Sequence, residues 1–221
     1  MSAFSTAPAG GGRKKRGEGH TRREEILQAA KELFLEQGYD QTTIRRIADR
    51  VGVSAPALYL YFQDKEQMML ALCDQTFGHL LEKIGEIERN VSDPLLRIRR
   101  FGEAYLHFGL EHPDEYRLIF VGNNVPESMR KIGHRMPIDD PTRPGVRGAL
   151  VFQRLVAILV EAEGAGLKLN YPADTCAELC WMGMHGVASV FITKPDFPWS
   201  NKDMLMSGML DILLKGIVRG A

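Results

Sequence analysis

The chain has 221 residues, and its 28 basic and 28 acidic side chains give a formal charge of zero at neutral pH. A chain of this length can bury a sizeable core and divide into two domains. Residues 1–65 hold 11 Lys and Arg against 8 Asp and Glu, whereas the remainder holds 17 against 20, which favours an anionic partner at the N-terminal end. Three cysteines without a secretory leader, and no run of about 18 apolar residues, argue against export and membrane insertion. We therefore expect a cytoplasmic protein.

The first 20 residues are small, polar and rich in glycine, and they include a basic run at residues 13–16. Such a composition predicts a disordered basic arm. The arm either solubilises the protein or lies along the minor groove of DNA, where it would add affinity by releasing counterions. Helical periodicity begins at Thr21, which has the spacing of a capping box with Glu24. This first helix is expected to end near Gly38.

Two short helices joined by a tight turn are predicted in residues 42–66. The first has an apolar face on one side and a charged face on the other. Gly52 follows its last apolar residue, where a left-handed backbone favours glycine. Ser54 can accept a hydrogen bond from the first amides of the next helix, and Pro56 suits its first turn. We expect the second helix to span residues 54–62, so the pair has the outline of a helix-turn-helix motif.

The rest of the chain is predicted to be helical as well. A long helix over residues 65–89 follows the motif. The later helical segments are residues 94–112, 114–120, 146–165, 173–193 and 200–218. Residues 121–145 hold four of the eleven prolines and lack periodicity, which favours a loop. We find no alternating strand pattern of useful length, and we expect an all-α fold of about nine helices.

Nine residues of the predicted motif and its flanks carry a resemblance to a known family. They are, in chain order, Thr43, Ala48, Gly52, Val53, Ser54, Leu58, Tyr59, Phe62 and Lys65. Over residues 21–72 the chain resembles the DNA-binding domain of the tetracycline-repressor (TetR) family of bacterial regulators. This implies a three-helix DNA-binding domain at residues 21–66 and a ligand-binding and dimerisation domain at residues 67–221. Ala55 and Ala57 depart from the family, which often has Lys and Thr there.

The second helix of the motif is expected to enter the major groove with its N-terminal residues toward the base edges. The resemblance implies that Arg45 reads a base directly. Tyr59 and Lys65 have groups suited to phosphate oxygens, while Tyr61 is equally consistent with a half-buried core position. The full set of predicted DNA contacts is Thr43, Arg45, Arg46, Ser54, Ala55, Pro56, Ala57, Tyr59, Tyr61 and Lys65.

Aromatic side chains beyond the motif are candidates to line a cavity for a small apolar effector. Residues 181–186 (WMGMHG) resemble the Trp-x-x-x-His-Gly signature of one C-terminal subclass of the family, the WHG domain, which implies ligand sensing and dimerisation. The predicted effector contacts are Phe77, Phe101, Tyr105, Phe108, Phe152, Trp181 and His185. Because a histidine on an apolar helix is more often a satisfied core residue than a ligand contact, both roles stay open for His185.

The last two predicted helices are expected to form a homodimer. One inserted helix reads only a few base pairs, whereas a two-fold dimer matches a palindromic operator on double-stranded DNA. The residues expected at the seam of the resulting four-helix bundle are Cys180, Met184, Val187, Val190, Met209, Ile212, Leu213 and Ile217. We therefore predict a dimeric, ligand-responsive transcriptional regulator, a repressor that a small apolar effector releases from its operator.

Two alternatives remain open at this point. The chain could be a helical enzyme or carrier with a vestigial helix-turn-helix, or a DNA binder controlled by a protein partner. Cys176 and Cys180 lie four residues apart with His185 nearby, but a zinc site needs further ligands. No set of Ser, His and Asp has a spacing that requires a nucleophile. We expect no metal, no cofactor and no catalytic residue.

Overall fold

The computed structural model describes residues 18–121, 138 and 140–220. Within these residues the chain forms nine α-helices and one short π-helix. The only extended pairing in this described part is an isolated antiparallel bridge between Leu169 and Val218. The predicted all-α fold is confirmed. Residues 1–17 of the predicted arm, and most of the predicted loop at 121–145, lie outside the described residues.

The N-terminal domain consists of α1 (Glu18–Gln37), α2 (Ile44–Val51) and α3 (Ala55–Leu58). α1 begins three residues before the expected Thr21, so residues 18–20 belong to a helix and not to the predicted arm. The turn between α2 and α3 forms as predicted, since Gly52 has a left-handed φ of 72°. The Ser54 hydroxyl caps α3 by accepting a hydrogen bond from the Ala57 amide at 3.3 Å.

The second helix of the motif is shorter than predicted. The chain leaves the α-helical conformation after Leu58 and turns through residues 59–61. The Tyr61 amide donates to the Leu58 carbonyl at 2.9 Å, a step of three residues that tightens the backbone. Residues 59–62 therefore continue the element as a compact turn, and their side chains are displayed differently from those of a regular helix.

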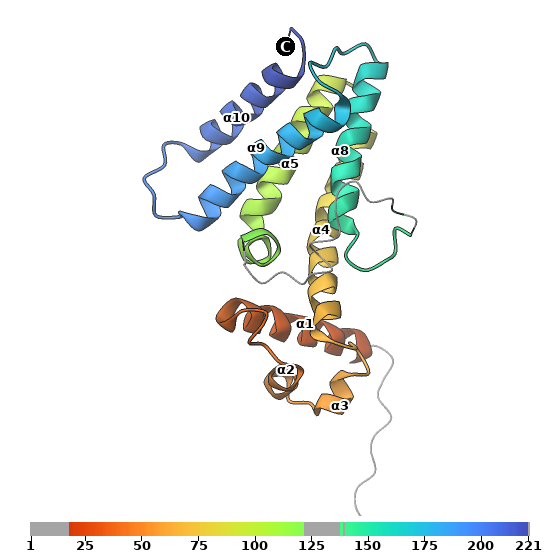
Figure 1. The fold of residues 1–221 in the computed structure, drawn as a ribbon, viewed down its shortest axis with the longest axis vertical. Coiled ribbons are helices and arrows are strands. Elements are labelled where there is room, and N and C mark those ends of the chain that lie inside the picture. Colours follow the sequence, from red (N-terminus) through yellow and green to blue (C-terminus); the bar gives the residue numbers. More distant parts are fainter. Residues whose placement is uncertain (1–17, 122–137, 139, 221) are drawn as a thin grey trace, which may run out of the picture.

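The C-terminal domain begins with α4 (Lys65–Asn90), which runs from the helix-turn-helix into the second domain (Figure 1). The other elements are α5 (Pro94–Glu111), α6 (Pro113–Tyr116), η1 (Arg117–Val121), α8 (Arg147–Gly164), α9 (Ala173–Thr193) and α10 (Lys202–Ile217). The bounds of the five long helices lie within two residues of the predicted ones. The helix expected at 114–120 is instead one α-helical turn followed by the π-helix η1.

The helices α4, α5, α8 and α9 pack around one apolar core, and α10 lies against α5 and α9 on the outer side of the bundle (Figure 1). The close approach of α10 depends on Gly102 of α5, because a Cβ atom there would come within 2.5 Å of Leu210 Cδ2. The helix-turn-helix lies at the end of the molecule opposite the C-terminus (Figure 1). Effector and DNA sites in the two domains would therefore communicate through α4 and its neighbours.

The helix α9 has the length and the mean hydropathy, 1.2 over an 18-residue window, of a candidate membrane span. The core helix of a globular domain passes the same test. Seven residues of α9 are buried in the described structure, and the helix packs against α5, α8 and α10.

Candidate DNA-binding surface and effector site

The helix α2 presents two arginines to solvent, and the structure gives them different surroundings. Arg46 donates to the side chain of Gln37 and to the main-chain oxygen of Gln41, so its guanidinium is held toward the loop after α1. Its amide donates to the hydroxyl of Thr43, the N-cap of α2. Arg45 is exposed, and in the described structure no hydrogen bond or ion pair engages it. Its guanidinium is therefore available for the base contact that the resemblance implies.

The helix α3 and the turn after it offer few polar groups for reading bases. The Ser54 oxygen is already used as the cap, Pro56 is exposed, and the alanines on either side of Pro56 are half-buried. Tyr59 is 53% exposed and suits a phosphate contact, whereas Tyr61 is half-buried against the core. Leu60, which the sequence analysis did not select, is 83% exposed.

Lys65 has a role that the sequence did not reveal. Its ammonium donates to the main-chain oxygens of Tyr39 at 2.7 Å, Thr42 at 3.2 Å and Asp40 at 3.3 Å. It also lies 4.2 Å from the centroid of the Tyr39 ring. An ammonium has three N–H donors, and all three are used here. We call this arrangement the lysine clip; it ties the start of α4 to the loop between α1 and α2, and a phosphate contact would require it to open.

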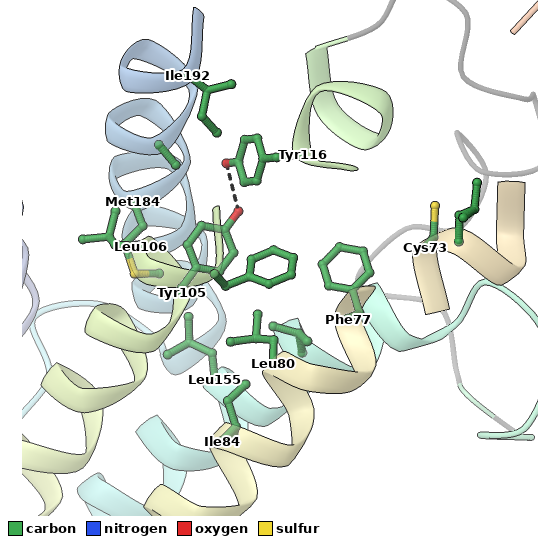
Figure 2. Close-up of a cluster of buried hydrophobic side chains, with 14 of the residues drawn as sticks. Cys73, Phe77, Leu80, Ile84, Tyr105, Leu106, Tyr116, Leu155, Met184 and Ile192 are labelled. Carbon is green, nitrogen blue, oxygen red and sulfur yellow. Dashed lines mark hydrogen bonds between the residues drawn. The ribbon is translucent and has the colours of Figure 1, made fainter. Parts of the chain in front are cut away.

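Six of the seven predicted effector residues are connected by contacts between aromatic rings in the core of the C-terminal domain. Phe77 stacks on Phe108 with ring centroids 5.5 Å apart, and Phe152 meets Trp181 edge-on at 6.4 Å. Figure 2 shows the Phe77 ring of α4 in the same buried cluster as side chains from α5, α8 and α9. The seventh residue, Phe101, lines a separate void against α9 and α10 whose volume is only about 10 Å³. That void holds at most one water molecule, so it cannot hold an effector as it stands.

A chain of hydrogen bonds runs through the aromatic cluster. Trp181 Nε1 donates to Tyr105 Oη at 3.1 Å, and Tyr105 Oη lies 3.3 Å from Tyr116 Oη (Figure 2). Tyr116 Oη lies 2.6 Å from His185 Nδ1, and His185 Nε2 lies 3.2 Å from the Ser189 hydroxyl. We call these five residues the tyrosine–histidine chain. Sequence analysis missed Tyr116, which is fully buried and lies at the centre.

Burial sets the protonation of this chain. It lowers the pKa of His185 and raises the pKa of both Tyr105 and Tyr116, so all three side chains are neutral at pH 7. With His185 neutral, the hydrogen bonds can all run in the same direction along the chain. Tyr105 then donates to Tyr116, Tyr116 donates to His185 Nδ1, and His185 Nε2–H donates to the Ser189 hydroxyl. His185 is thus a satisfied core histidine, and it also belongs to the only group of linked polar side chains inside the described aromatic cluster.

Comparison with known proteins gives matches in both domains. Residues 26–72 match the profile of bacterial regulatory proteins of the tetR family, and residues 98–211 match the tetracyclin repressor-like C-terminal domain. The HTH-type transcriptional activator FasR of Mycolicibacterium smegmatis is 38% identical over 181 residues, which span 76% of this chain and 82% of that protein. The chain belongs to the TetR family.

Other TetR relatives match parts of the chain or its fold. The transcriptional repressor AcnR of Corynebacterium diphtheriae is 40% identical over 65 residues, which cover 29% of this chain and 34% of AcnR. The structure of the regulator FadR from Bacillus subtilis in complex with stearoyl-CoA covers 88% of this chain and 98% of its own, with a TM-score of 0.70. Its 17% identity supports the fold alone. The chain is a ligand-responsive, DNA-binding transcriptional regulator, and its expected place in the WHG subclass stays a prediction.

The structure divides the predicted dimer residues of this TetR protein into two groups. Cys180, Met184 and Ile217 are buried inside their own chain, so their assignment to the seam needs correction. Val190 and Ile212 are 41% and 67% exposed. The other predicted residues, Val187, Met209 and Leu213, are half-buried. Helical periodicity found the apolar sides of α9 and α10 but could not show which side the chain itself covers.

Proposed function

We propose that this TetR protein is a homodimer that binds a palindromic operator and releases it when a long-chain fatty acyl thioester enters the C-terminal domain. The observation that carries the proposal is the tyrosine–histidine chain, a set of hydroxyl donors enclosed by aromatic rings. An acyl chain would take the place of packed rings, while its carbonyl oxygen would accept a hydrogen bond from Tyr105 or Tyr116. The stearoyl-CoA bound to a regulator of the same fold supports this ligand class.

A short element connects this site to the DNA-binding domain. Tyr116, at the centre of the tyrosine–histidine chain, follows Glu115 directly on α6. Glu115 accepts a hydrogen bond from Lys31 of α1 at 3.0 Å, and both side chains are about four-fifths buried. An effector that displaced the Tyr116 hydroxyl would shift α6 and disturb the ion pair with α1. This route, together with α4, would change the distance between the two recognition elements of a dimer.

The proposed dimer uses the outer faces of α9 and α10. Besides Val190 and Ile212, these helices expose Met182 and Met204, which are 57% and 74% exposed. Four large exposed apolar side chains on two adjacent helices indicate a surface that binds another protein chain. A two-fold copy of the same face would build a four-helix bundle, and dimers are typical of the family.

The direction of regulation depends on where the operator lies. A bound dimer that overlaps a promoter blocks transcription, and we keep repression as the proposed outcome because AcnR, which is 40% identical over 65 residues, is named a repressor. Activation is the second candidate, because FasR, matched over both domains, is named an activator. A reporter gene with the selected operator placed upstream of the promoter, or across it, separates the two.

Operator release by acyl thioesters tests the proposal directly. Stearoyl-CoA should dissociate the protein from a selected operator fragment and raise its melting temperature, whereas free CoA should do neither. Tyr116→Phe should raise the stearoyl-CoA concentration needed for release about tenfold, because a hydrogen bond in an apolar site contributes roughly 1.5 kcal/mol. Tyr171→Phe, at an exposed tyrosine, is the matched control. Release by free CoA, or no response to any acyl-CoA, would contradict the effector class.

The same experiments address the two alternatives. The matched relatives named above are transcriptional regulators, which supports a cytoplasmic regulator without catalytic activity. Turnover of acyl-CoA without binding to any DNA fragment would favour the enzyme. Operator release by a protein in the absence of any small ligand would favour control by a protein partner.

A further inference from the structure

The turn after α3 displays a leucine that none of the described residues covers. Leu60 is 83% exposed, and it lies four residues after the exposed Pro56. Leu58, between them, is fully buried, whereas Pro56 and Leu60 are both exposed, so both side chains point away from the core. If α3 enters the major groove, this exposed side is the one that faces the DNA.

The chemistry of this surface is almost entirely apolar. The Ser54 oxygen accepts the hydrogen bond that caps α3, and residues 55–58 carry no side-chain hydrogen-bonding group. Base edges in the major groove offer donors, acceptors and a single apolar group, the C5-methyl of thymine. The side chains of residues 55–58 and of Leu60 can therefore discriminate between bases only through that methyl group or through DNA shape.

We infer that Leu60 is a specificity-determining residue that reads thymine by packing its side chain against the C5-methyl group in each half-site. Tyr59, beside it and 53% exposed, contacts the phosphate backbone and fixes the depth at which Leu60 enters the groove. Arg45 on α2 then reads a guanine, and Leu60 reads a thymine, so a half-site is defined by one polar and one apolar contact. The inference rests on α3 entering the major groove.

The position of Leu60 argues for DNA as its partner and against a second copy of this chain. The proposed dimer faces of α9 and α10 lie at the other end of the molecule from α3 (Figure 1). Arg45 and Arg46 of the neighbouring helix α2 are exposed, and the basic run at residues 13–16 precedes this domain in the sequence, as suits a DNA-binding surface. Leu60 on this surface would become buried when the element enters the major groove of the operator.

Replacement of thymine by deoxyuridine tests this inference, because it removes the C5-methyl group and nothing else. The operator is first selected from random duplexes with the wild-type protein, and each thymine of a half-site is then replaced in turn. One replacement should weaken wild-type binding about fourfold, which corresponds to roughly 0.8 kcal/mol for one buried methyl-sized group at 1.36 kcal/mol per tenfold change.

The matching protein variant completes a double-mutant cycle. Leu60→Ala should bind the thymine and deoxyuridine operators with equal affinity, since the side chain that senses the methyl group is shortened. Because Leu60 is 83% exposed, the melting temperature of the Leu60→Ala variant should stay within about 1 °C of that of the wild type. Leu96→Ala, at a 40% exposed leucine of α5, is the control and should keep the fourfold preference.

Three results would overturn the inference. Wild-type protein that tolerates deoxyuridine at every position does not read a methyl group. Leu60→Ala that weakens binding to both operators equally, and keeps the preference, points to a backbone contact. A thymine preference that disappears with Arg45→Ala but persists with Leu60→Ala assigns the reading to α2.

Discussion

Lys65 has two competing roles that one substitution can distinguish: the structural hydrogen bonds of the lysine clip and the phosphate contact predicted from the sequence. In Lys65→Met the alkyl part of the side chain remains, but the ammonium and its three hydrogen bonds to the loop between α1 and α2 are removed. The loop carbonyls of Tyr39, Asp40 and Thr42 then depend on water. We expect a less stable DNA-binding domain whose interaction with phosphates is unchanged.

The magnitude follows from the geometry of the clip. A hydrogen bond from a charged group contributes about 1.5 to 3 kcal/mol, and the bond to Tyr39 at 2.7 Å is the strong one. The two longer bonds share the same charge and add little, and the contact with the Tyr39 ring adds about 0.5 kcal/mol. Since Lys65 is partly exposed, we expect the free energy of unfolding to fall by about 2 kcal/mol, or the melting temperature by about 4 to 8 °C for a chain of this size.

Two measurements distinguish a structural role of Lys65 from a contact with DNA phosphates. Thermal unfolding reports the stability. The salt dependence of operator binding reports how many phosphates the protein neutralises, and its slope changes by about 0.9 for each phosphate that is no longer neutralised. The control is Lys83→Met, at a largely exposed lysine of α4 that pairs with Glu86. We expect a lower melting temperature and an unchanged salt slope for Lys65→Met, and neither change for the control. An unchanged melting temperature with a shallower slope would refute the clip.

Three further predictions concern the C-terminal domain. Ile212→Glu should keep the fold but sediment near the single-chain mass of 24.8 kDa, whereas a stable dimer of this variant would contradict the proposed seam. Because burial lowers the pKa of His185, the unfolded chain binds a proton more readily, and the free energy of unfolding should fall as the pH drops below about 6.5. His185→Gln should remove that part of the pH dependence, and an unchanged profile would show that other groups cause it. Glu115→Gln should leave stearoyl-CoA binding intact but require about fivefold more of it to release the operator, because the ion pair with Lys31 is broken; an equally large decrease in ligand binding would argue against a coupling role.

Local signals in the sequence were enough for much of the fold. Caps, prolines and helical periodicity gave the five long helices of the C-terminal domain within two residues, because each signal acts over one or two turns of chain. The left-handed Gly52 and the cap at Ser54 followed from the same local chemistry. The end of α3 was predicted too late, since its apolar residues continue to Phe62 although the backbone tightens after Leu58.

The sequence by itself determined the all-α fold through its helical periodicity, and its resemblance to the TetR family identified a DNA-binding regulator with the helix-turn-helix near its N-terminal end. Only the tertiary structure decided what each selected side chain touches. Lys65 reaches carbonyls 23 to 26 residues earlier in the chain, and Tyr116 meets a histidine 69 residues later. Such contacts depend on how helices pack, and periodicity gives the apolar face of a helix without naming the surface that covers it. For the same reason Cys180 could be placed on an apolar face of α9 from the sequence, but its burial within its own chain could not.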